Sequence, residues 1–235
     1  GNARGEGQLE KANAYYTASL LLVVVTTVIV WPVTAVFKKE IFSLFGANEA
    51  LMPLVLEYGD WIIWTFPAFI LSSYFTCIIR CDGSPNYVMG AVVAGGVFPM
   101  NLGMSGAAIA TAGGTIVQFI VLLCYLLKKQ NRLRLVKPRQ LSKAIMKSLS
   151  AGFSASILEF SFIVLTCILN NQIMRYGGAV ALSIFGVVLS CSGMFQHIYT
   201  GVGQAIQPIA ANNYGAGQVL RIFRLRRISL ATVTA

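Results

Sequence analysis

Apolar residues are gathered into long blocks along this chain, with the charged residues confined to short segments between them. Four blocks contain no Asp, Glu, Lys or Arg, and a fifth, residues 148–174, contains only Glu159. About 20 apolar residues in a helix cross the roughly 30 Å hydrocarbon core of a bilayer. The blocks therefore predict membrane-spanning helices near residues 12–37, 61–79, 84–98, 106–127, 148–174 and 178–208, with the start of another at Ile228.

Composition supports an all-α, polytopic membrane protein. The 235 residues are 56% hydrophobic and only 11% charged, whereas soluble domains average about 25% charged residues. The five cysteines lie in or beside apolar blocks without paired spacing, so we expect small buried side chains and no disulfide framework or metal site. Both ends of the chain look cut from a longer sequence, and no signal peptide is expected.

The net charge of +10 would suggest nucleic acid as a partner of a soluble protein. Here the basic residues are concentrated in a connector, residues 128–147, and after the last long block, and such segments normally stay in the cytoplasm. With six spans, fifteen Lys and Arg fall on that side and three on the other. The partner that follows from this charge is the lipid bilayer, with no nucleic acid.

An internal repeat helps to set the number of spans. NARGEGQ at residues 2–8 resembles NNYGAGQ at residues 212–218, with four identities at a constant offset of 210. Each copy precedes a basic residue and an apolar run, so equivalent copies should face the same side of the membrane. That needs an even number of spans between them, as in two-lobed transporters with parallel repeats of six helices.

Small and helix-breaking residues predict local packing. Glycines and alanines between Gly90 and Gly114 recur at three- and four-residue spacing, which allows helix backbones to approach closely in lipid. Pro32, Pro67 and Pro208 lie inside apolar blocks and should kink or break their helices.

Glu159 is the strongest candidate functional residue. It is the only acid among 27 residues and lies about 16 Å into its helix, near the bilayer midplane. An ionised carboxylate is costly there, so Glu159 should be protonated, paired or facing water. It could bind H⁺ or Na⁺ in alternation with a cationic substrate, or it could be a packed acid that bonds to a neighbouring helix.

Further polar residues lie in the same two predicted helices and should face the protein interior. His197, the sole histidine, is either an interior hydrogen-bonding residue or a proton carrier beside Glu159. Asp60 and Asp82, at the edges of spans, are explained by solvated headgroup positions. The candidate cation- and substrate-binding residues are Glu159, Asn170, Gln196, His197, Tyr199, Gln204 and Gln207.

Several segments, taken in order, resemble the multidrug and toxic compound extrusion (MATE) family of antiporters. GVGQAIQP at residues 201–208 and NYGA at 213–216 resemble the end of that family's eighth helix and the following loop. GEGQLEKA at residues 5–12 resembles the equivalent loop after the second helix, and RCDGSP at 80–85 resembles the loop after the fourth. SGAAIAT at 105–111 resembles the start of the sixth helix.

The resemblance implies a fragment of a twelve-helix protein with two six-helix lobes. Residues 1–127 would be helices 3–6 of the N-terminal lobe, residues 128–147 the cytoplasmic connector, and residues 148–235 helices 7, 8 and the start of 9. Helices 1 and 2 are absent, and the fifth helix is about a dozen residues short around Val97 to Asn101.

The resemblance also implies a function, which is not enzymatic: multidrug efflux in exchange for Na⁺ or H⁺ by alternating access. Small organic cations would be the substrates, Na⁺ or H⁺ the coupling ion, and no cofactor is needed. A transported Na⁺ would bind near Glu159. The intact protein would be a monomer in the plasma membrane of a bacterium.

Two other classes stay open at this stage. A lipid-linked oligosaccharide flippase of the same superfamily would need a more basic interior than these apolar blocks provide. A helical membrane protein without transport activity is the second alternative.

Overall fold

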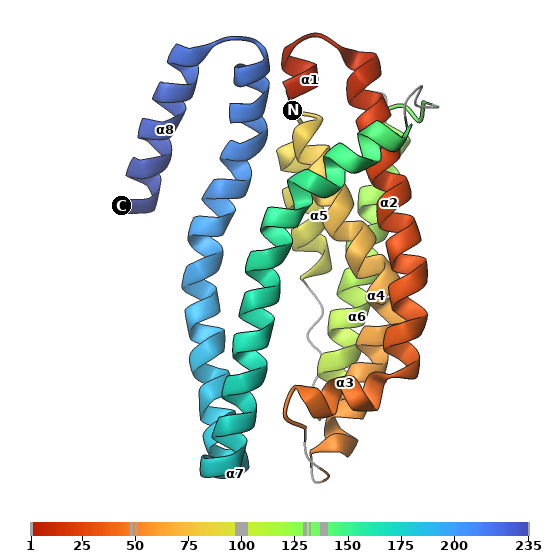
Figure 1. Cartoon of the computed structure of the whole chain (residues 1–235), viewed down its shortest axis with the longest axis vertical. Helices are drawn as coiled ribbons and strands as arrows, with labels where there is room; N and C mark the ends of the chain where they lie inside the picture. The colour runs from red at the N-terminus through yellow and green to blue at the C-terminus, as the bar shows by residue number, and fades with distance from the viewer. Residues whose placement is uncertain are drawn as a thin grey trace.

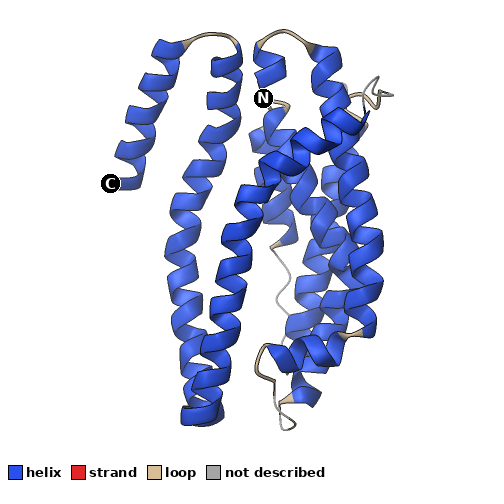
Figure 2. Ribbon diagram, in the orientation of Figure 1, coloured by secondary structure: helices blue, strands red, loops and turns tan. Residues whose placement is uncertain are grey.

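The structure is a computed structural model that describes residues 2–47, 49, 51–96, 103–128, 131, 133–136 and 141–234. Within these ranges the secondary structure is helical, with no strand (Figure 2). This confirms the all-α membrane class. The helices are α1 (Asn2–Gly5), α2 (Leu9–Val36), α3 (Lys38–Leu44), α4 (Met52–Cys81), α5 (Pro85–Gly95), α6 (Gly103–Leu126), α7 (Leu141–Gly215) and α8 (Val219–Thr234).

The long segment α7 is two antiparallel helices joined by a tight turn. Gly178 has φ 69° and ψ −170° in the middle of the segment, a backbone conformation that glycine adopts without a Cβ penalty. The chain reverses near this residue, so that a first arm (141–177) and a second arm (179–215) run side by side (Figure 1). The spans expected at residues 148–174 and 178–208 correspond to these arms.

Four described segments are long and apolar enough to cross a membrane: α2, α4, α6 from Gly106, and α7 from Ala155. The expected span at residues 84–98 is represented by α5, which has 11 residues. At 1.5 Å per residue α5 is about 16 Å long, roughly half of a hydrocarbon core. The predicted shortening at Val97 to Asn101 lies outside the described residues.

Two helices begin earlier in the sequence than the spans that the hydropathy pattern predicted. The first arm of α7 begins at Leu141, inside the segment expected to be a basic connector, and α8 begins at Val219 instead of Ile228. In both places the hydropathy pattern indicated where lipid begins, whereas Lys and Arg are good helix formers and let a helix extend beyond the membrane. The arginines after Leu220 are therefore helical residues of α8.

Of the two outcomes expected at the prolines, a kink or a break, the break does not occur. Helix continues on both sides of Pro32 in α2, Pro67 in α4 and Pro208 in α7. In a long membrane helix, neighbouring groups can satisfy the carbonyl that a proline leaves unbonded.

The buried core lies between α4, α5 and α6. Phe75, Ile79, Val88, Leu122 and Tyr125 form one contiguous cluster, each 4% exposed or less. The predicted close approach of small residues is confirmed between α5 and α6. A Cβ at Gly95 would lie 2.7 Å from the carbonyl oxygen of Gly114.

The internal repeat has the same backbone structure in both copies. Glu6 N donates to Asn2 O at 2.9 Å and Gln8 N to Ala3 O at 2.8 Å, while Ala216 N donates to Asn212 O at 3.0 Å and Gln218 N to Asn213 O at 2.9 Å. Gly7 and Gly217 both have positive φ, at 75° and 69°. The copies lie side by side at one end of the molecule, where α1 contacts α7 (Figure 1). Their position at the same end agrees with the expectation that both copies face the same side of the membrane.

Candidate functional site

Glu159 lies on a face of the first arm of α7 that is turned toward α1–α6, which we call the first half. Ser148, Glu159 and Asn170 are spaced by 11 residues, and 11 residues make about three helical turns with an offset of roughly 20°. Ser148 lines a cavity shared with α1, α2 and α4, and Asn170 Nδ2 donates to Phe45 O at 3.3 Å. Because Glu159 lies between these two contacts on one stripe, it belongs to the face of the arm that is turned toward the first half.

Glu159 is an exposed residue. Within the described residues it has no hydrogen bond and no ion pair with another side chain. The role of Glu159, as a packed acid bonded to a neighbouring helix or as a binding residue, stays a prediction. The side chain is accessible for an ion or a ligand.

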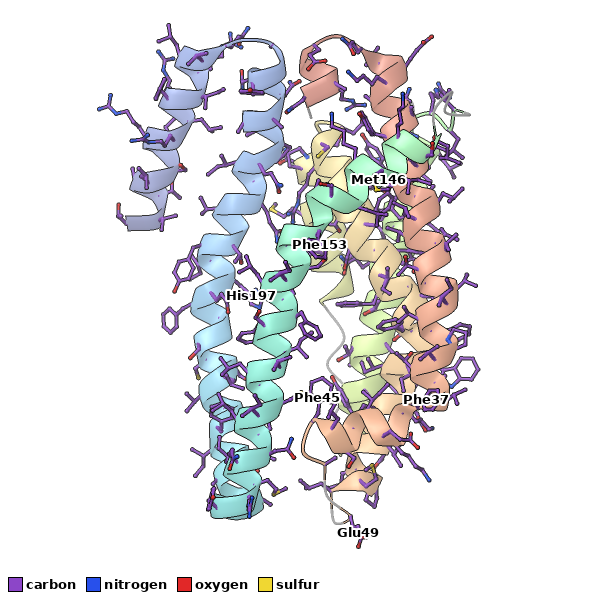
Figure 3. All side chains as sticks on the ribbon, viewed as in Figure 1. Phe37, Phe45, Glu49, Met146, Phe153 and His197 are labelled. Atoms are coloured by element: carbon purple, nitrogen blue, oxygen red, sulfur yellow. The ribbon has the colours of Figure 1, made fainter. Side chains whose placement is uncertain are left out.

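His197 is placed at the level of Glu159. Glu159 precedes Gly178 by 19 residues (178 − 159) and His197 follows it by 19 (197 − 178). Each residue is thus about 28 Å along its arm from the turn. Figure 3 shows His197 near the middle of the second arm, with its side chain exposed. The two titratable residues lie on adjacent antiparallel arms at the same depth.

The polar residues of the second arm cover a broad face of that helix. Gln196 and Gln207 are 11 residues apart and so differ by roughly 20° around the axis. By the same geometry, Gln204 and His197 lie about 80° and 100° to one side of Gln196, and Tyr199 about 60° to the other. The five residues do not converge on one point: they extend along about three turns of the arm, and all are exposed.

Two of the predicted residues join the halves of the chain. Arg80 Nη1, at the end of α4, donates to Gln204 Oε1 at 2.6 Å. At the opposite end of the molecule, Asn170 bonds to the residue that follows α3, and its neighbour Asn171 bonds to the last residue of α3, with Asn171 Nδ2 donating to Leu44 O at 2.9 Å. Gln204 and Asn170 therefore lie at the two ends of the region between the halves, and Glu159 lies between them in depth.

Asp82 is a buried residue that the sequence reasoning placed wrongly at a solvated membrane edge. Its side chain is 0% exposed and forms an ion pair with Arg4, whose side chain is 16% exposed. Tyr125 donates its hydroxyl to Asp82 Oδ2 at 2.6 Å, and Arg4 Nη1 donates to Cys81 O at 3.0 Å. This network ties α1 to the ends of α4 and α6.

A cavity of about 410 Å³ lies beside this network. Arg4, Asp82, Tyr16, Lys11 and Lys147 are among the side chains that line it. Glu159 and the predicted residues of the second arm do not line it. The cavity and the Glu159 face are thus two separate features of the described residues.

Comparison with known proteins connects this arrangement to a family. The MatE family profile matches residues 1–105. The "Probable multidrug resistance protein YoeA" of Bacillus subtilis is 24% identical over 249 residues, with 98% of this chain and 54% of the relative covered. The "FAD transporter" of Shewanella oneidensis is 25% identical over 257 residues, with the same coverage of both chains.

The "Multidrug export protein MepA" of Staphylococcus aureus is 23% identical over 202 residues, covering 79% of this chain and 44% of that protein. No solved structure matches the chain. The chain spans about half the length of the curated relatives that it matches. The profile match over residues 1–105, the relatives that match most of the chain and the polytopic helical fold agree, and this chain is similar to the MatE family of membrane proteins.

Proposed function

We propose that this chain is part of a secondary transporter that exports small organic cations in exchange for Na⁺ or H⁺ by alternating access. In this proposal Glu159 is the residue that binds the coupling ion and the cation in turn. The protein acts without a cofactor, as a monomer in the plasma membrane, with its basic segments in the cytoplasm. It is a transporter and not an enzyme.

The observation that supports the proposal best is the position of Glu159. An exposed acidic residue lies about midway along an apolar helix, on the face that is turned toward the first half of the molecule and on the stripe defined by Ser148 and Asn170. Acids inside a membrane are costly and generally mark ion or substrate pathways. This geometry suits a group that is reached from the space between two lobes.

The charge of the two arms favours a cation as cargo. Between Lys147 and Arg175, and between Arg175 and Arg221, Glu159 is the only charged residue in the sequence. One carboxylate cannot neutralise a coupling ion and a cationic substrate at once, so binding of either ligand weakens binding of the other. By linkage this coupling is reciprocal, as exchange requires.

The remaining polar residues would complete the site. His197, at the depth of Glu159, would relay a proton if H⁺ is the coupling ion. Gln196, Tyr199, Gln207 and Asn170 would orient the substrate through hydrogen bonds, and Gln204 would act near the end where it contacts Arg80. A lipid-linked oligosaccharide would need Lys or Arg on these arms to bind its pyrophosphate, which makes flippase activity the weaker proposal.

The test is transport by the full-length protein in proteoliposomes with Na⁺ and H⁺ gradients imposed separately. The substrates are a fluorescent organic cation and FAD, since the matched relatives are named for different cargoes. We expect one of the two gradients to drive movement of the cation. Movement of FAD alone, or of neither compound, would refute the proposal.

Glu159→Gln tests the role of the carboxylate in the same assay. The amide keeps the size of the side chain but removes its charge, so gradient-driven movement should fall to the leak rate of empty vesicles. Glu40→Gln is the matched control, since Glu40 is an exposed acid on α3, and it should transport like the unmodified protein. Unimpaired transport by the Glu159→Gln variant would remove this residue from the mechanism.

A further inference from the structure

The two copies of the internal repeat are in reciprocal contact at the end of the molecule that bears the basic segments. A Cβ built on Gly5 would clash with Asn212 O, and a Cβ built on Gly215 would clash with Asn2 O. Because the repeat offset is 210, Gly5 corresponds to Gly215 and Asn2 to Asn212. The same contact therefore occurs twice with the roles exchanged, which is the pattern of a two-fold interface.

The closeness of this contact requires glycine at both positions. The Cβ position of Gly5 lies 2.9 Å from Gly215 Cα, and that of Gly215 lies 2.9 Å from the carbonyl carbon of Asn2. These are backbone atoms, which cannot move aside as the tip of a long side chain can. Neither glycine has a positive φ, so their requirement comes from the contact and not from the local backbone.

The backbones are in close contact here, but the residues around the contact are little buried. None of the residues of α1 is buried, and on the other side Asn212 and Ala216 are exposed. One polar bond between side chains, from Arg80 to Gln204 at 2.6 Å, adds to it at the same end. Interfaces that stay permanently closed bury much apolar surface, so the exposure of these residues is that expected of an interface that separates.

The first-half side of the contact is itself held in place. Arg4, the residue before Gly5, is fixed by the buried Asp82. At the opposite end of the molecule, Asn171 bonds to Leu44 O at 2.9 Å. The basic ends of the halves can therefore part while this far bond remains as a pivot.

We propose that the Gly5–Gly215 contact is the closure of the transport pathway on the basic side, which opens and closes as substrate and coupling ion exchange. This inference rests on the proposed function. The closing surfaces are the two repeat copies, and the glycines set how near the two lobes can come. A methyl group on either glycine would hold the closure open.

The test measures the closure directly by pulsed electron paramagnetic resonance. Spin labels are placed at Glu10→Cys and Leu220→Cys in full-length protein whose native cysteines have all been replaced by alanine. Glu10 and Leu220 are exposed and equivalent under the repeat offset. Distances are recorded in proteoliposomes with and without the organic cation and each ion gradient.

Gly215→Ala and Gly5→Ala are compared with Gly203→Ala, which lies in the same arm as Gly215 but has no atom within 4 Å of its Cβ position. We expect the short-distance population to fall about fivefold or more in Gly215→Ala and in Gly5→Ala. Gly203→Ala should match the unmodified protein. The double variant should open no further than either single one, because both changes act on one contact.

Three outcomes separate the hypotheses. Unchanged distances in both Gly215→Ala and Gly5→Ala would overturn the closure, and so would distances in a transporting protein that never respond to cation or gradient. A protein that transports nothing, but whose distances respond to ligand and depend on Gly215, would refute the exchange proposal while supporting the closure.

Discussion

The buried pair of Arg4 and Asp82 gives a sharp energetic prediction, because the chain also contains an exposed pair for comparison. Asp82→Ala removes the partner of a charged side chain that is only 16% exposed. Deleting one member of a buried ion pair typically costs about 3–5 kcal/mol, since the other charge stays desolvated and unpaired. The same substitution also removes the acceptor of the Tyr125 hydroxyl, 2.6 Å away.

The exposed pair joins Lys38 to Asp60 at 2.5 Å, with side chains 31% and 47% exposed. Solvent already screens these charges, so Asp60→Ala should cost only about 0–1 kcal/mol. We therefore expect the two alanine variants to differ in unfolding free energy by at least about 2 kcal/mol. In both pairs the aspartate lies in α4 or directly after it, and its partner lies on another helix of the first half. The two pairs therefore differ mainly in how deeply they are buried.

The measurement is reversible unfolding of the purified full-length protein in mixed micelles, arranged as a double-mutant cycle. Arg4→Ala, Asp82→Ala and the double variant give the coupling energy, which should be about 2 kcal/mol or more, against less than about 1 kcal/mol for Lys38 and Asp60. A coupling energy for Arg4 and Asp82 as small as that of the exposed pair would show that water reaches Asp82, and would refute the burial argument.

Two further predictions concern contacts between helices. Gly114→Ala should lower thermal stability because its Cβ would clash with Gly95 O. The control, Gly113→Ala, has no atom within 4 Å of its Cβ position and should be neutral or stabilising by up to about 1 kcal/mol. Equal melting temperatures of the two variants would contradict the close approach of α5 and α6. Asn171→Ala removes the bond to Leu44 O and should cost about 0.5–1.5 kcal/mol, measured by the same unfolding assay, and an unchanged free energy would show that this bond is not formed in the membrane protein.

The sequence pattern predicted the helices well because lipid imposes a simple rule: a spanning segment must be apolar and long. The short repeat was also recognisable, since glycines at fixed positions determine the local backbone. Boundaries outside the membrane were predicted less well. Leu141 and Val219 begin helices whose first turns are charged, and hydropathy does not distinguish a basic loop from a basic helix.

Asp82 shows why the network at the end of α4 was not predicted. An aspartate after an apolar run looks the same whether water or protein surrounds it, and its partner Arg4 is 78 residues away in the sequence. Glu159 was identified because a lone acid in a long apolar run is conspicuous, but its orientation needed the contacts of Asn170 and the cavity position of Ser148. Membrane-spanning segments can be recognised as long apolar blocks in the sequence, whereas contacts between residues far apart in the chain have no such sequence pattern.

The reciprocal glycine contact also has an evolutionary consequence. If the two halves arose by duplication, most positions could diverge independently once each half had its own neighbours. Gly5 and Gly215 cannot, because each fits against the backbone of the other copy, and a larger residue on either side would spoil both contacts. The two halves therefore constrain each other's divergence at this place, and a change at one glycine would be tolerated only with a matching change in the other copy.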